Sequence, residues 1–120
     1  MVRIEADAGK NRIVLILSGR PEIEKSSAFR VQLEDALARV RSPVDVLSDI
    51  RGLEELNPDL IGEFKVFGER LRAFGVRRVV RIVGRSAQAA VQVERLTRQL
   101  KGHAAHLAFS EAEAEQVFGK

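Results

Sequence analysis

The sequence predicts a single α/β domain with one mixed, mostly parallel five-stranded sheet, an N-terminal hairpin and four helices. Strand-like runs alternate with amphipathic segments of helical length in the order ββαβαβαβα. The run from Ile13 to Leu17 is apolar throughout, as expected for a central strand covered on both faces. No linker, repeat or low-complexity segment interrupts this order, so one domain spanning residues 1–120 is expected.

The first third of the chain predicts a β-hairpin followed by a helix. Residues 2–6 and 12–17 read as strands, and the segment between them contains Gly9 and Asn11, which suit a turn with positive φ. A break at residues 18–21 precedes apolar residues that recur at helical spacing up to Ser42 and Pro43. These residues are Phe29, Leu33, Ala36, Leu37 and Val40.

The middle of the chain predicts a buried strand over residues 44–50 and a second helix. Asn57, Pro58 and Asp59 are typical of a helix start, with Asn at the N-cap, Pro in the first turn and an acid facing the helix dipole. Gly75 is expected to end this helix. Its wide apolar face indicates core packing first, and a dimer contact or a cover over a lipophilic ligand second. The face consists of Leu60, Ile61, Phe64, Phe67, Leu71 and Phe74.

The last third predicts a strand over residues 76–83, a third helix, a short strand over 103–109 and a terminal helix. The third helix is indicated by Ala89, Val93, Leu96 and Leu100, with Gly102 at its end. Ser110 and Glu113 have the spacing of a capping box, which opens the helix that contains Val117 and Phe118.

Two motifs add a family resemblance to this pattern: Asp49-Ile-Arg-Gly52, and the strand from Arg78 to Gly84, which reads RVVRIVG. Together with the element order they resemble the SpoIIAA-like fold of STAS domains, above all its uncharacterised SpoIIAA-like branch, which is similar in fold to CRAL-TRIO lipid-binding domains. In the anti-sigma factor antagonists of that family, an Asp-Ser-Ser-Gly motif at the start of the second helix carries a serine whose phosphorylation switches partner binding. The aligned positions here are Asn57-Pro58-Asp59-Leu60, with no hydroxyl group. The resemblance therefore implies a regulatory module without the serine switch.

The candidate binding site lies where the parallel strands end, because ligands of open α/β sheets favour the crevice at the carboxyl ends of the strands. Two readings stay open: the polar residues there hold a phosphate, carboxylate or partner protein, or Asn57 and Ser86 are helix caps and nothing more. By the resemblance, Asp59 occupies the place of the acceptor serine, as a permanent negative charge or as an ordinary first-turn acid. The candidate ligand- or partner-binding residues are Arg51, Asn57, Asp59, Arg85 and Ser86.

Catalysis, metal binding and cofactor binding are not expected. The chain has no cysteine, which excludes a thiol nucleophile, a disulfide and a cysteine metal site. His103 and His106 are expected on opposite faces of a strand, and Asp45 and Asp49 are about 13 Å apart by strand rise, too far for a carboxylate pair. Ser48 lies inside a predicted strand and is a poor substitute phosphate acceptor. We predict no catalytic residues, no metal ligands and no cofactor.

The net charge of +3 conceals a basic segment. Residues 70–101 contain nine basic residues and one acid. They steer an anionic partner to one face, pair with acids of the first half, or are merely solvated. Trp and Tyr are absent, which argues against stacking on nucleic acid. Arg81 lies among apolar strand residues, so we expect either a location on an open face or at an end of the sheet, or burial with an acid such as Asp45 or Asp49.

These observations predict a non-catalytic interaction or regulatory module. No segment approaches the roughly 18 apolar residues of a membrane span, so we expect a cytoplasmic protein without stable membrane insertion. The expected partner is a protein or a second copy of the chain, and nucleic acid is not expected. The alternative function is that of a carrier or sensor of a small anionic or lipophilic ligand, held near Arg51, Arg85 and the second helix.

Overall fold

The computed structural model describes residues 2–21, 26–55, 57, 60–84, 91 and 105–119. The residues that indicated the third helix, Ala89, Val93, Leu96 and Leu100, lie outside this part, as does Gly102. Within the described residues, five strands and three helices follow one another along the chain. They are β1 (Val2–Asp7), β2 (Arg12–Gly19), α1 (Ser26–Leu37), β3 (Val44–Leu53), α2 (Ile61–Phe74), β4 (Val76–Ile82), β5 (His106–Ala108) and α4 (Glu111–Phe118).

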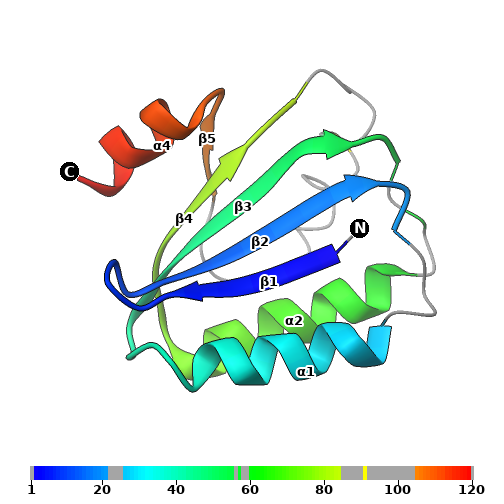
Figure 1. The fold of residues 1–120 in the computed structure, drawn as a ribbon, viewed down its shortest axis with the longest axis horizontal. Helices are drawn as coiled ribbons and strands as arrows, with labels where there is room; N and C mark the ends of the chain where they lie inside the picture. The colour runs from blue at the N-terminus through cyan, green and yellow to red at the C-terminus, as the bar shows by residue number, and fades with distance from the viewer. Residues whose placement is uncertain are drawn as a thin grey trace.

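The strands form a single mixed sheet in the order β1-β2-β3-β4-β5 (Figure 1). β1 runs antiparallel to β2, and the remaining neighbours are parallel, so the predicted hairpin and the mostly parallel sheet are confirmed. Between β2 and β3, and again between β3 and β4, a helix returns the chain to the same end of the sheet, which gives parallel pairing. The carboxyl ends of β3, β4 and β5 therefore share one edge.

The hairpin turn is fastened to the loop that follows α1. Asn11 has a φ of 51°, the positive φ that its sequence predicted. Its side-chain amide donates to the carbonyl oxygens of Arg41 at 2.9 Å and Pro43 at 3.1 Å, and its side-chain oxygen accepts from the Arg41 N–H at 2.7 Å. One residue thus satisfies three backbone groups and fixes the hairpin beside the start of β3.

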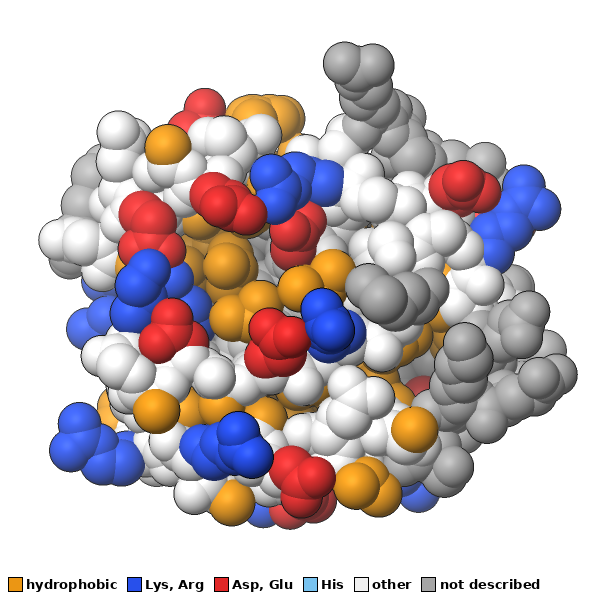
Figure 2. All heavy atoms as spheres, viewed as in Figure 1, with side chains coloured by type: hydrophobic (Ala, Val, Ile, Leu, Met, Phe, Trp, Pro, Cys, Tyr) orange, Lys and Arg blue, Asp and Glu red, His pale blue; other side chains and the backbone are white. Residues whose placement is uncertain are grey.

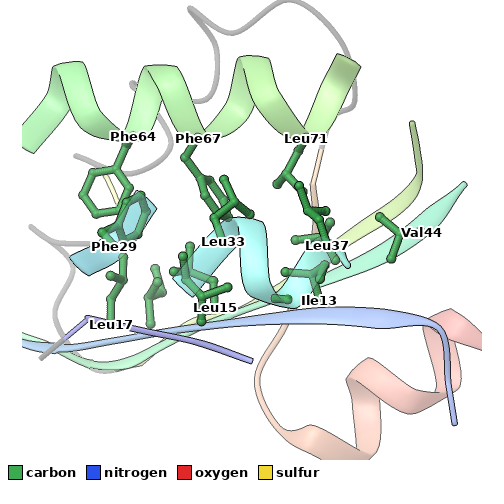
Figure 3. Packing of buried hydrophobic residues seen from close by; sticks show 14 of the residues in the cluster. Ile13, Leu15, Leu17, Phe29, Leu33, Leu37, Val44, Phe64, Phe67 and Leu71 are labelled. Carbon is green, nitrogen blue, oxygen red and sulfur yellow. The ribbon is translucent and has the colours of Figure 1, made fainter. Parts of the chain in front are cut away.

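The main core lies between one face of the sheet and helices α1 and α2 (Figure 3). Ile13, Leu15 and Leu17 of β2 point into it at alternate positions, and the Phe29 ring of α1 meets Phe64 edge-on at a centroid distance of 5.4 Å. The apolar face of α2 is buried here, as the core interpretation predicted: Leu60, Phe64, Phe67 and Leu71 are each at most 7% exposed. Burying each such side chain stabilises the fold by about 1.5–3 kcal/mol.

The C-terminal end of α2 agrees with the prediction, and its N-terminal end differs from it. Gly75 ends the helix as expected, with a φ of 111° and an N–H that donates to the Leu71 carbonyl. At the other end, the α-helix begins at Ile61 with Leu60 as N-cap, later than the expected N-cap at Asn57. The reason is a tight turn in which the Leu60 N–H donates to the Asn57 carbonyl at 2.9 Å, so the first turn is of the 3₁₀ type.

The opposite face of the sheet is covered by α4, which packs on β4 and β5. Val80, Ile82 and Ala108 form a second apolar cluster with Ala114 and Phe118 of this helix. The predicted terminal helix is confirmed, and the Ser110 hydroxyl accepts from the Glu113 N–H at 3.1 Å. The Glu113 carboxylate, however, accepts from the N–H of Phe109 rather than from that of Ser110, one residue earlier than a standard capping box places it.

Of the two alternatives for Arg81, the structure confirms burial, but Asp45 and Asp49 are not on its side of the sheet. Arg81 is buried, and its neighbours Val79 and Val83 pack on the main core, so its side chain lies on the α1 and α2 side of the sheet. The two aspartates alternate with Leu47, which packs on the second cluster, and therefore face the other side. They are held by Arg77 and Arg51.

Two glycines offer a test of how tightly the strand ends are packed. A Cβ on Gly84 would lie 2.3 Å from the Arg51 carbonyl oxygen and 2.8 Å from its Cα, whereas a Cβ on Gly62 of α2 would meet nothing within 4 Å. Gly84→Ala is expected to lower the free energy of unfolding by about 1–3 kcal/mol, since backbone has to move. Gly62→Ala is expected to raise it by roughly 0.5 kcal/mol. Urea denaturation of both variants checks this, and equal stabilities would contradict the close approach of the two strands.

Candidate functional site

The candidate site is the edge of the sheet at which β3, β4 and β5 end. Arg51 extends from the end of β3, and Gly84 follows β4 with its backbone packed on that of Arg51. Glu111 begins α4, directly after β5 and Ser110. Only a glycine fits between the two strand ends, because any side chain there would meet the Arg51 backbone. Local packing therefore brings residues from three separate parts of the chain to this edge.

Arg51 is held between two carboxylates. Its Nε donates to Asp49 Oδ1 at 3.0 Å and its Nη2 to Asp49 Oδ2 at 2.7 Å, while the same Nη2 lies 2.9 Å from Glu111 Oε1. These hydrogen bonds, first from Asp49 and then from Glu111, raise the pKa of Arg51 above its ordinary value. The group carries one positive and two negative charges, so Arg51 is not a free cation for an incoming anion.

The carboxyl group of Asp49 is held in its ionised form by Arg51. Partial burial by itself raises the pKa of Asp49, but the hydrogen bonds that its carboxylate accepts from the Arg51 side chain and backbone N–H outweigh burial. The pKa of Asp49 therefore lies below its ordinary value. A bidentate contact between two residues of the same strand end fixes the Arg51 side chain in one direction.

The structure describes two of the five predicted site residues. Arg51 is exposed at the edge, and Asn57 is half-buried in the turn before α2, with its carbonyl bound to the Leu60 N–H. Asp59, Arg85 and Ser86 lie outside the described residues. Glu111 was missed, because its place in the first turn of α4 explained it as a helix-dipole acid. Glu111 follows the last predicted parallel strand, and from this position its place at the same edge as Arg51 could have been predicted.

Other sequence expectations about chemistry can be placed as well. Ser48 is buried at 7% exposure, which supports its rejection as a phosphate acceptor. Asp45 and Asp49 share a face, but each binds its own arginine. In the described part of the chain, no three His, Asp or Glu side chains are grouped as a metal site would need. His106 is exposed on β5, and His103 lies outside that part.

The described members of the basic segment make contacts within the chain. Arg70 pairs with Glu34 through two hydrogen bonds of 2.9 Å, and Arg77 pairs with Asp45 at 2.9 and 2.8 Å. Arg78 donates to the carbonyl oxygen of Val117. Arg85, Arg95, Arg98 and Lys101 lie outside the described residues. Acids and carbonyls of distant segments thus engage these three arginines, as the pairing alternative proposed.

An open groove of about 390 Å³ separates β1 from α1. Gln32 crosses it, and its side-chain oxygen accepts from the Ile4 N–H at 3.0 Å, which satisfies a donor on the outer edge of β1. The groove contains one arginine beside two acids, so its charges do not converge on an anion. Its lining residues are Ile4, Glu5, Ala6, Gln32, Asp35, Ala36 and Arg39.

None of the helices in the described ranges has the length and apolar character needed to cross a bilayer.

No protein-family model matches the chain, and no curated protein matches it. Several solved structures match it in fold. An uncharacterised protein of the DUF3478 family with a SpoIIAA-like fold, from Shewanella loihica PV-4, superposes with a TM-score of 0.72 at 18% identity, over 98% of this chain and 92% of that one. The unphosphorylated anti-sigma factor antagonist SpoIIAA gives 0.65 at 15% identity, over 100% and 98% of the two chains. An anti-sigma factor antagonist from Mycobacterium paratuberculosis gives 0.60 at 16% identity, over 100% and 94%. The protein has the SpoIIAA-like fold, as its sequence motifs indicated.

The Asp49–Arg51 pair predicts a specific pH dependence. Because the pKa of Asp49 is depressed in the folded state, its stabilisation is complete above the ordinary value of 3.8 and is lost as the pH falls through the folded pKa. Asp49→Asn should therefore lower the free energy of unfolding by roughly 1 kcal/mol at pH 7 and flatten its decline in acid. Urea denaturation from neutral to acidic pH measures both quantities. Asp35→Asn, in the β1–α1 groove, is the control, and equal acid slopes for wild type and Asp49→Asn would contradict the assignment.

Proposed function

We propose that this protein is a non-catalytic regulatory module that binds a partner protein at the carboxyl edge of its sheet. The observation that carries the proposal is the ordered polar edge itself, in which Asp49 and Glu111 hold the Arg51 side chain in place. A surface of fixed, mutually neutralised charges suits docking of a protein surface better than capture of a small ion. The fold supports the proposal, since two solved structures that share it are anti-sigma factor antagonists.

The proposed contact residues are Arg51, Asn57, Asp59, Arg85 and Ser86. Of these, Asp59 stands where the family resemblance places the switching serine, and an aspartate carries its negative charge without a kinase. Ser48 does not replace the serine, because it is buried. The module we propose is therefore constitutively competent for its partner in the cytoplasm, with no phosphorylation step at this position.

A carrier of a small anionic or lipophilic ligand is the second candidate, and the described geometry favours it less. The apolar face of α2 is used by the core, and Arg51 is neutralised by two acids. A carrier needs a cavity with convergent polar groups, which the open β1–α1 groove does not provide.

Native mass spectrometry separates the two candidates. If the protein is an interaction module, its native mass should be 13.3 kDa or a whole multiple of it. Denaturation should then separate any subunits and release no other mass. A carrier predicts an additional non-covalent mass that is lost on denaturation. Reproducible detection of such an adduct would overturn the preference for an interaction module.

Charge reversal at position 59 tests the proposed edge. Once a partner has been captured with the wild-type protein, Asp59→Lys is expected to weaken its binding by about tenfold or more, because a like charge then faces the partner's complementary group. Asp35→Lys, in the groove between β1 and α1, is the matched reversal far from that edge and should leave the dissociation constant unchanged. Isothermal titration calorimetry gives both values. Unchanged affinity with Asp59→Lys would exclude this edge as the binding surface.

A further inference from the structure

Helix α4 is acidic, and the sheet face beneath it contains arginines together with the aspartates Asp45 and Asp49, which pair with Arg77 and Arg51. The helix contains Glu111, Glu113 and Glu115, no basic residue, and no cation in its last turn to oppose the negative end of the helix dipole. The cations come from the sheet instead. Three arginines from three neighbouring strands reach the helix: Arg12 of β2, Arg51 of β3 and Arg78 of β4.

Arg12 makes the most extensive of these contacts. Its side chain is 6% exposed, both Nη atoms donate to the Glu115 carboxylate, and its guanidinium lies 3.9 Å from the centre of the Phe118 ring. Lys10 Nζ approaches the same carboxylate at 3.4 Å. The hydrogen bonds from Arg12 hold the pKa of Glu115 below its ordinary value. Arg12 therefore depends on α4 for the hydrogen bonds of both Nη atoms and for the ring on which it stacks, while its buried Nε has no hydrogen-bond partner among the described residues.

The other two arginines hold the two ends of the helix. Arg51 binds Glu111 in the first turn at 2.9 Å, and Arg78 donates to the Val117 carbonyl in the last turn. Between these polar contacts, α4 buries two side chains, Ala114 and Phe118. A helix of eight residues is unstable in isolation, so its order depends on these contacts with the sheet.

The surface on which α4 lies is larger than the helix. Val14 and Ile16 of β2 alternate with the core residues Ile13 and Leu15, so they face the same side as Arg12, and both are only half-buried. Figure 2 shows apolar side chains recessed among acidic and basic ones, in the region where Figure 1 draws β1, β2 and β3 beside α4. A longer amphipathic helix would cover this additional apolar surface.

We propose that this face of the sheet is a docking surface for an acidic amphipathic helix of a partner protein, and that α4 is its internal occupant, which the partner displaces. We call it the helix cradle. It consists of the arginines Arg12, Arg51 and Arg78 around the apolar side chains Leu47, Val80 and Ile82, and it extends to Val14 and Ile16. The negative charge of α4 identifies the class of partner, and the half-buried side chains of Val14 and Ile16 give a longer helix additional area to bury. The cradle shares Arg51 with the proposed edge contacts, and it does not depend on Asn57, Asp59, Arg85 or Ser86.

A peptide made from the chain itself provides the probe. The peptide FSEAEAEQVFGK, residues 109–120, is labelled with a fluorophore, and its binding to the full-length protein is followed by fluorescence anisotropy. Glu111→Gln combined with Glu115→Gln weakens the internal helix but leaves the cradle intact. We expect this variant to bind the peptide at least about tenfold more tightly than wild type, because its own α4 competes less.

Two controls make the result specific. Glu113→Gln changes a glutamate whose carboxylate bonds the Phe109 N–H rather than a cradle arginine, and it should bind the peptide like wild type. A peptide with Gln at the positions of Glu111 and Glu115 should bind the double variant more weakly than the unsubstituted peptide does, because it lacks the carboxylates that the cradle arginines bind. If the double variant binds the labelled peptide no better than wild type, the proposal is overturned. A shift of that variant to a dimer without peptide uptake also overturns it, and assigns the cradle to α4 of a second copy.

Amide hydrogen exchange of the wild-type protein tests the displacement without any substitution. Salt screens the arginine contacts, so the amides of residues 111–118 should exchange faster at about 0.5 M than at about 0.05 M salt, while those of β2 and β3 stay protected. Exchange of α4 in step with β2 and β3 at both salt concentrations would show that the helix opens only with global unfolding, and would exclude a displaceable occupant.

Discussion

Both faces of the parallel strands β2, β3 and β4 have to be shielded from water, and the molecule shields them in two different ways. On one face, α1 and α2 bury a continuous apolar layer that includes Phe29, Phe64 and Phe67. On the other face, the described part of the chain places one short helix, α4, on a smaller cluster. Because side chains alternate along each strand, the charged residues Asp45 and Asp49 necessarily fall on the less covered face. The fold thus concentrates its polar contacts where the apolar cover is smallest.

This division explains why several arginines of the protein form ion pairs within the chain. Arg12 is buried on the less covered face, where a guanidinium is stable only with a carboxylate or carbonyl nearby, whereas Arg51 and Arg77 are exposed and their pairs fix the direction of the side chains. Arg12, Arg51 and Arg77 each meet an acid from another part of the fold or from their own strand. Of the basic residues between positions 70 and 101, the structure shows Arg70 and Arg77 paired with acids of the first half, Glu34 and Asp45. What remains for recognition is the arrangement of these pairs and of the apolar surface between them.

The sequence predicted the order of the elements well, because strand and helix periodicities are local properties of the chain. It failed on the start of α2, where a strong N-cap pattern at Asn57 precedes a 3₁₀ turn that propensity does not distinguish from an α-helical one. It also failed on the partner of Arg81. Which acids share its face depends on the register between β3 and β4, and that register includes an irregularity near Val44.

The sequence by itself determined the layers of this protein. Its apolar periodicity specifies which segments are strands, which are helices and which sides of them are buried, and these choices suffice for the SpoIIAA-like fold. Only the tertiary structure decided which charges meet. Arg51 and Glu111 are 60 residues apart in the chain, and Arg12 and Glu115 are 103 apart. Such pairs leave no periodic signal, because the distance between two distant side chains is set by strand register and helix packing rather than by any property of the residues between them.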